Sequence, residues 1–144
     1  MITLEGYITT FGITPAFTDD REGLKDMVGG QSGLVILGDK GYVGENLTKE
    51  MSDQGICLMA LKRSNSKANW PKPVRQLIFQ LRRSIETVFS QLSEQLHAER
   101  VLAKSFQGLC TRFVNKIFAY NLCLALNSIF HETCELGRIK QLIF

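Results

Sequence analysis

The sequence predicts a mixed α/β or α+β fold in which strands come early and long helices close the chain. Residues 34–37 and 56–61 are short apolar runs with the composition of buried strands. Residues 72–97 carry apolar side chains at three-to-four-residue spacing, and residues 107–131 are apolar on nearly every side. Strands followed by helices are typical of an α/β or α+β protein.

The first third of the chain predicts a hairpin and a short helix. Residues 2–4 and 7–13 alternate weakly between apolar and polar side chains, as hairpin strands do. Asp19 with Glu22 three residues later resembles a capping box, so we expect a helix over about residues 19–28. The hairpin and the two apolar runs together predict a four-stranded sheet.

The middle of the chain predicts a helix between the two buried strands. Leu47 and Met51 stand at i and i+4 in residues 44–53, and Gly55 is suited to end that helix. We expect residues 1–144 to form one domain. Within it we expect strands and short helices over 1–63, a basic loop over 64–72, long helices over 73–131 and a tail over 132–144.

Composition favours a globular cytoplasmic protein. Hydrophobic residues make up 44% and charged residues 22% of the chain, which are ordinary globular values. The uninterrupted apolar runs are too short to span a bilayer, and residues 1–17 lack the pattern of a signal peptide. The cysteines form no Cys-x-x-Cys pair, so we expect buried free thiols and no zinc site at Cys57, Cys110, Cys123 and Cys134.

Basic residues are strongly segregated along the chain. The net charge is only +3, yet residues 62–85 contain no acid. Cations can hold a nucleic-acid backbone while neighbouring carboxylates hold a metal ion, so this pattern suits a phosphodiester substrate. The seven basic residues of this segment are Lys62, Arg63, Lys67, Lys72, Arg75, Arg82 and Arg83.

Asp39 directly follows the first apolar run, between Gly38 and Lys40. Ligands of α/β folds bind at the carboxyl edge of the sheet, and the flanking glycines Gly38 and Gly41 permit a tight turn there. Two interpretations remain open. Asp39 is either a metal ligand at this edge or the cap of a turn or of the following helix.

Glu86 lies off the apolar stripe of its predicted helix, on the face that carries Arg82. It is either one half of an exposed helical ion pair or a metal ligand beside phosphate-binding cations. Arg82 precedes Glu86, which is the less favourable order for an i,i+4 pair, so we favour the metal ligand.

The segment 62–72 carries Trp70 and is either a DNA-binding segment or a solvated loop. Lys and Arg side chains would neutralise phosphates there, and an indole can stack on an unpaired base. The sequence contains no Gly-x-x-x-x-Gly-Lys phosphate loop and no nucleophilic-triad motif, which sets those chemistries aside.

Three stretches resemble the second half of bacterial insertion-sequence transposases of the Asp-Asp-Glu type. They are Phe11-Gly-Ile-Thr-Pro-Ala-Phe-Thr-Asp-Asp20, Ile36-Leu-Gly-Asp-Lys-Gly-Tyr42 and Arg82-x-x-x-Glu86-x-x-Phe89. The likeness extends from about residue 2 to residue 130. It implies a ribonuclease-H-like catalytic core, two Mg²⁺ or Mn²⁺ ions, and cleavage and joining of transposon ends in the bacterial cytoplasm, at the nucleoid.

The resemblance also assigns residues. Asp39 matches the second catalytic acid, Glu86 the third, and Arg82 the arginine one turn before it. Phe79 and Ser93 depart from the pattern, since related transposases often carry Tyr and Lys there. The residues expected to contact DNA are Lys40, Lys62, Arg63, Lys67, Trp70, Lys72, Arg75, Arg82 and Arg83.

The first catalytic Asp of these transposases lies on a strand before the hairpin, where this sequence has no match. We therefore expect Met1 to be an internal start, the core to lack its first strand, and the chain alone to be inactive. The alternative is a non-catalytic module that binds DNA, or that binds full-length transposase through residues 107–131 and inhibits it. The expected partners are transposon-end and target DNA, with self-association or full-length transposase as the protein partner and no membrane.

Overall fold

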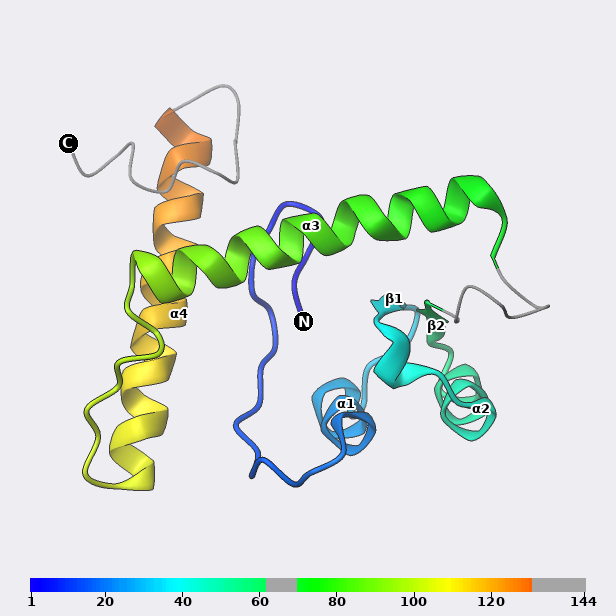
Figure 1. Cartoon of the computed structure of the whole chain (residues 1–144), viewed down its shortest axis with the longest axis horizontal. Coiled ribbons are helices and arrows are strands. Elements are labelled where there is room, and N and C mark those ends of the chain that lie inside the picture. The colour runs from blue at the N-terminus through cyan, green and yellow to red at the C-terminus, as the bar shows by residue number, and fades with distance from the viewer. Residues whose placement is uncertain (62–69, 131–144) are drawn as a thin grey trace. The chain divides into compact units, whose positions relative to one another are not determined.

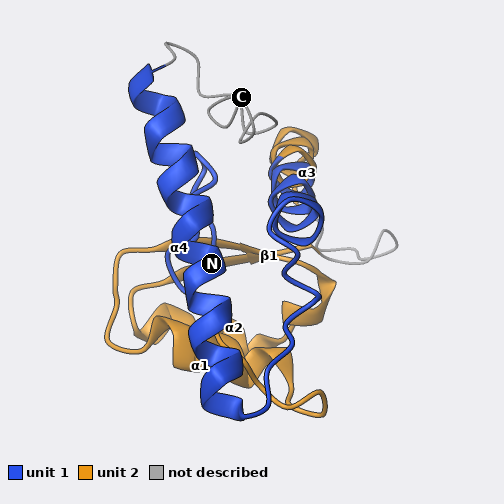
Figure 2. Ribbon diagram, turned by 90° about the vertical axis from the view of Figure 1, so that its left-hand side faces the viewer, with its two compact units in different colours: residues 1–11, 81–144 blue, residues 12–80 orange. Residues whose placement is uncertain are grey.

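A computed structural model describes residues 1–61 and 70–130 of the chain (Figure 1). The chain divides into two compact units, and the division falls inside one long helix (Figure 2). Unit 1 comprises Met1–Phe11 with Leu81–Phe144, and unit 2 comprises Gly12–Gln80. The organisation into a single domain stays a prediction.

Unit 2 is built around a parallel β-α-β arrangement. Strand β1 (Val35–Gly38) pairs with β2 (Cys57–Ala60) in a two-stranded sheet, with Val35 opposite Cys57 and Gly38 opposite Ala60. A parallel pair needs a long crossover, and helix α2 (Glu45–Asp53) provides it. Leu47 and Met51 of α2 are buried as the i,i+4 pattern predicts, and α2 packs against β2.

Two smaller elements complete this part of unit 2. Helix α1 (Asp20–Val28) precedes the sheet, and Asp19 is its N-cap, as the sequence predicts. The short 3₁₀ helix η1 (Lys40–Tyr42) follows β1 directly and contacts both α1 and β2. Gly55, with φ of 74°, ends the α2 segment just before β2.

The four-stranded sheet is not found in residues 1–61 and 70–130. The expected hairpin is reduced to one antiparallel bridge between Ile2 and Ile8, and these residues belong to unit 1 rather than to the sheet. The burial expected for β1 is also wrong, because Val35 is 67% exposed and the other β1 residues are half-buried. Among the described residues β1 has a strand neighbour on one side only, so its apolar side chains lack the cover that the sequence pattern implied.

The expectation of buried thiols is wrong for the described cysteines. Cys57 is exposed, and Cys110 and Cys123 are half-buried; all three are free thiols. Side chains alternate along a strand, and Leu58 and Ala60 take the buried positions of β2, which leaves Cys57 on the other face. Cys134 lies outside the described residues.

Unit 1 is helical. Helix α3 (Lys72–Glu94) contributes its part from Leu81 onward, and helix α4 (Phe106–Phe130) follows. Both helices were predicted, although α3 ends three residues earlier than expected. His97, with φ of 50°, adopts a left-handed conformation that no helix continues. The Lys116 ammonium group donates hydrogen bonds to the Leu96 and His97 carbonyls and so fixes the chain beyond α3.

The core of unit 1 joins the N-terminal bridge to both helices. Its buried members are Ile8, Val88, Leu92, Ile117, Tyr120 and Leu124. The Asn121 side-chain amide of α4 accepts from the Ile8 backbone N–H at 2.9 Å and donates to the Ile8 carbonyl at 2.8 Å. Both backbone polar groups of Ile8 are therefore satisfied by one side chain instead of by a neighbouring strand.

Helix α4 is the single helix in the described part of the chain that is long and apolar enough to cross a membrane. This criterion uses length and composition only, and core helices of soluble proteins also meet it. Two charged residues, Arg112 and Lys116, lie in α4. A search of the sequence for uninterrupted apolar runs therefore does not detect this helix.

Replacing Leu124 tests the core of unit 1. Leu124 is 1% exposed, so Leu124→Ala should leave a cavity and lower the free energy of unfolding by about 2–5 kcal/mol. Leu102→Ala is the matched control, since Leu102 is 84% exposed and should lose almost nothing. Urea denaturation followed by circular dichroism measures both. Equal losses for the two variants would contradict this core.

Candidate functional site

Asp39 occupies the turn at the carboxyl end of β1, as the sequence predicts. It is the N-cap of η1, and its Oδ1 accepts a hydrogen bond from the Lys40 backbone N–H at 2.7 Å. The Asp39 carbonyl accepts from Tyr42 N–H at 3.0 Å, which closes the turn. The turn-capping role is therefore present. A carboxylate has about four lone-pair positions, so one N–H bond does not exhaust its capacity to bind a cation.

Tyr42 packs directly over Gly38, one residue before Asp39. A Cβ atom added to Gly38 would lie 3.1 Å from the Tyr42 Cβ and 3.2 Å from its Cδ2. A side chain at position 38 would therefore fit tightly against Tyr42, which would have to shift by a few tenths of an ångström. Gly41, in the same turn, has open space around it. The requirement for glycine is therefore specific to position 38.

Tyr42 also reports which charges surround the turn. Burial raises the pKa of the Tyr42 phenol, and the negative charges of Asp20 and Asp39 raise it further. Asp20, the first residue of α1, thus adds negative charge at Tyr42, and α1 contacts η1. No spacing in the sequence shows that α1 approaches η1, so this proximity comes from the tertiary structure alone.

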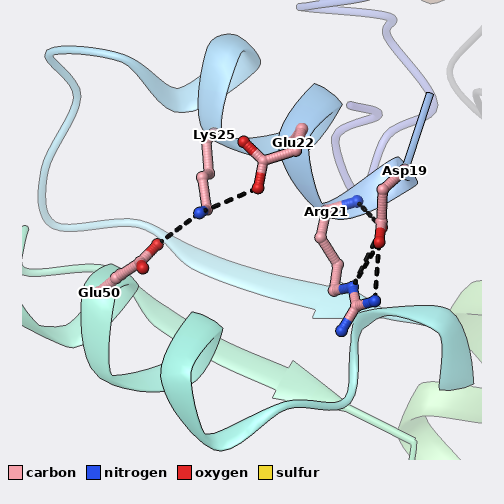
Figure 3. A network of polar contacts seen from close by, with 5 residues as sticks. All are labelled: Asp19, Arg21, Glu22, Lys25 and Glu50. Atoms are coloured by element: carbon pink, nitrogen blue, oxygen red, sulfur yellow. Dashed lines mark hydrogen bonds and ion pairs between the residues drawn. The ribbon is translucent and has the colours of Figure 1, made fainter.

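A polar network holds α1 in place beside α2 (Figure 3). The Arg21 guanidinium binds the Asp19 carboxylate through Nε at 3.0 Å and Nη2 at 2.7 Å, and it holds the pKa of Asp19 down at about 2. Lys25 contacts Glu22 at 3.1 Å and Glu50 of α2 at 2.8 Å. The expected capping box is incomplete, because Glu22 pairs with Lys25 and Asp19 caps the Arg21 backbone N–H.

The carboxyl ends of β1 and β2 meet at one edge of the sheet, because Gly38 lies opposite Ala60. Trp70 returns to this edge, where its indole N–H donates to the Ala60 carbonyl at 2.9 Å. The basic residues Lys62, Arg63 and Lys67 lie outside the described residues. Trp70, near the C-terminal end of the predicted basic loop (residues 64–72), is thus bonded to the sheet edge that carries Asp39.

The start of α3 continues this basic segment in unit 2. Lys72 is exposed, whereas Arg75 is half-buried. The Arg75 Nε is a buried donor with no hydrogen-bond acceptor among the described residues. A buried cationic donor without an acceptor costs free energy.

Glu86 lies on the part of α3 that belongs to unit 1. The Arg82 Nε donates to Glu86 Oε1 at 3.1 Å, and both side chains are largely exposed. The ion pair that seemed disfavoured by its order is therefore formed, although an exposed pair of this kind contributes only about 0.3–0.5 kcal/mol. Arg83 and Glu86 also line a shallow depression of about 510 Å³ on this helix, together with Thr87, Ser90, Gln91, Glu94 and Gln95.

The predicted site residues thus fall into two groups. Asp39, Lys40, Trp70, Lys72 and Arg75 belong to unit 2, and Arg82, Arg83 and Glu86 belong to unit 1. That Asp39 and Glu86 bind the same metal ion stays a prediction. Within residues 1–61 and 70–130, no three His, Cys, Asp or Glu side chains are grouped so that they could hold a metal ion.

Comparison with known proteins gives one family. A family model described as "Transposase DDE domain" matches residues 1–105, a stretch that contains both Asp39 and Glu86 and ends one residue before α4. Searches of curated proteins and of solved structures find no match.

Replacing Gly38 and Gly41 separately tests the Asp39 turn. In Gly38→Ala the new Cβ makes a tight contact with Tyr42, which has to shift by a few tenths of an ångström, so we expect faster hydrogen exchange of the Tyr42 and Val43 amides, which close the η1 turn. Gly41→Ala adds the same atom where nothing lies within 4 Å and should leave those amides unchanged. Exchange measured by NMR compares the two. Equal protection in both variants would contradict the Gly38–Tyr42 contact.

Proposed function

Because this chain belongs to the transposase DDE domain family, we propose that Asp39 and Glu86 are two of the carboxylates that hold divalent metal ions for DNA cleavage and joining. The family acts in DNA transposition. The single observation that carries the proposal is the family match over the stretch that holds both acids. The position of Asp39 at the carboxyl end of a parallel strand supports it, since α/β folds bind ligands there.

The donor set fits the proposed ions. Mg²⁺ and Mn²⁺ prefer carboxylate oxygens, and Asp39 and Glu86 are both exposed on rigid elements, a 3₁₀ turn and a long helix. When bound, a pair of such ions would activate the attacking oxygen and stabilise the leaving oxygen of a phosphodiester. Arg82 holds the Glu86 carboxylate until a cation competes for it, and its guanidinium is then available to a phosphate.

The basic residues supply the proposed grip on DNA. Exposed Lys40, Lys72, Arg82 and Arg83 would contact phosphates, and the half-buried Arg75 is assigned to the same role from the sequence. Lys62, Arg63 and Lys67 are assigned to the same role from the sequence. The indole N–H of Trp70 serves the protein itself, so any contribution of Trp70 to DNA would come from stacking of its ring.

We further propose that the chain acts on DNA in the cytoplasm as part of a ribonuclease-H-like core and that by itself it does not cut. Two matched carboxylates are fewer than this chemistry uses. The family resemblance assigns no residue of this sequence to the first catalytic Asp. A non-catalytic role is therefore the second candidate: the chain would bind DNA, or bind intact transposase and inhibit it.

Binding of metal to the isolated chain tests the two carboxylates. With Fe²⁺ in place of Mg²⁺, hydroxyl radicals should cut the backbone near Asp39 and near Glu86, because the radicals form at the bound ion. Asp39→Asn should weaken cutting at both places by at least about tenfold if the two residues share an ion. Asp53→Asn removes an equally exposed acid at the end of α2 and is the control. Absence of cuts near both residues would rule out the metal assignment.

The salt dependence of DNA binding tests the proposed contacts between this chain and DNA. Affinity for duplex DNA should fall steeply with salt, and Arg83→Gln should reduce the slope of log affinity against log salt by about 1. Lys49→Gln makes the same charge change on α2 and should not alter the slope. No strand cleavage is expected with Mg²⁺. Cleavage by the purified chain would overturn its proposed inactivity. DNA left unbound at low salt would overturn every role in which this chain contacts DNA and leave only the binding of intact transposase.

A further inference from the structure

The outer side of α4 carries an uncharged apolar stripe. Val114, Phe118 and Leu122 follow one another at i, i+4 and i+8 and are 46%, 66% and 45% exposed. Ile129, two turns further on, is 72% exposed. We call these four residues the α4 stripe. Contiguous exposed apolar patches of several hundred Å² are often interaction surfaces.

The opposite side of α4 is already occupied. Ile117, Tyr120 and Leu124 are buried in the core of unit 1, and Asn121 is bonded to Ile8. The two charged residues of the helix bind backbone carbonyls of the segment between α3 and α4, Arg112 that of Leu102 and Lys116 those of Leu96 and His97. The charges are therefore committed to the protein itself, and none belongs to the α4 stripe.

We propose that the α4 stripe is a dimerisation surface that packs against the same stripe of a second copy of this chain. A symmetric dimer places each residue opposite a copy of the same patch, so a patch of like charges would repel itself. The α4 stripe has no charge and meets no such penalty. The four-residue spacing of Val114, Phe118 and Leu122 forms the kind of ridge that interdigitates when two helices cross at about −50°.

The size of the α4 stripe fits a modest dimer. A fully buried aromatic side chain covers about 150–250 Å², and the exposed fractions of the four residues correspond to roughly 400 Å² per copy. The exposed, uncharged Thr111 and Asn115 widen this surface. Two copies together thus approach the roughly 1,000 Å² that a specific interface requires, at the low end of the range. The expected dimer is reversible rather than obligate.

A second copy fits α4 better than a lipid bilayer does. A helix surrounded by lipid tails presents apolar side chains on all sides, whereas the inner side of α4 includes Lys116 and Asn121, both bonded to other parts of unit 1. The inference also stands apart from the catalytic proposal. Helix α4 begins at Phe106, beyond the residues that match the transposase family.

Light scattering coupled to size-exclusion chromatography tests the dimer on the full chain. The mass should rise with concentration from that of a 16.2 kDa monomer towards twice that value. Phe118→Asp places a charge at the centre of the α4 stripe and should raise the dimer dissociation constant by at least roughly tenfold. Phe118→Leu keeps an apolar side chain there and should retain the dimer.

Phe17→Asp is the matched control, because Phe17 is 91% exposed but lies in unit 2, far from α4 in the sequence. It should leave the mass unchanged. Leu122→Asn is the second stripe variant and should act like Phe118→Asp, and circular dichroism checks that both remain helical. A monomer at every concentration, or a dimer unaffected by both stripe variants, would overturn the proposal. Stripe-dependent binding to phosphatidylcholine–phosphatidylglycerol vesicles by a chain that stays monomeric would also overturn it, in favour of a membrane surface.

Discussion

The parallel pairing of β1 with β2 is the constraint on which the rest of unit 2 depends. Strands that run in the same direction cannot be joined by a tight turn, so the chain must cross over through η1 and α2 before it can pair again. Parallel pairing also brings both carboxyl ends to one edge. Asp39 directly follows β1 at this edge, and the Trp70 indole N–H donates a hydrogen bond to the carbonyl of Ala60 at the end of β2. The position of the candidate metal ligand therefore follows from strand direction.

The helices were predictable from the sequence and the sheet was not, for one physical reason. The i,i+4 pattern of Leu47 and Met51 is local, and it already specifies which side of α2 is buried. Burial of a strand depends on neighbours elsewhere in the chain. Val35 and Cys57 have strand-like apolar surroundings in the sequence, yet both are exposed. Composition identified the strands but could not show how many partners they would find.

The candidate site shows the same division between local and tertiary information. A strand ending in Gly-Asp was enough to place Asp39 in a turn, because the signal lies within a few residues. The packing of Tyr42 on Gly38 and the nearness of Asp20 depend on the approach of α1 to η1, which no sequence spacing encodes. The order of Arg82 before Glu86 in the sequence disfavours an ion pair between them, yet the structure contains this pair. Preferences of about 0.2–0.5 kcal/mol are too small to exclude a contact that the geometry allows.

Unit 1 shows how a side chain can satisfy backbone groups that a neighbouring strand would otherwise satisfy. The Asn121 amide uses one N–H donor and its oxygen acceptor, which is the same pair of groups that a neighbouring backbone would offer Ile8. This bond fixes the rotation of α4 about its axis, because Asn121 must face the N-terminal segment. With Tyr120 and Leu124 turned into the core by the same rotation, Phe118 and Leu122 are left on the outer side. The exposed stripe of α4 is therefore a consequence of how the helix is anchored, and no rotation of the helix could bury it without breaking the bonds to Ile8.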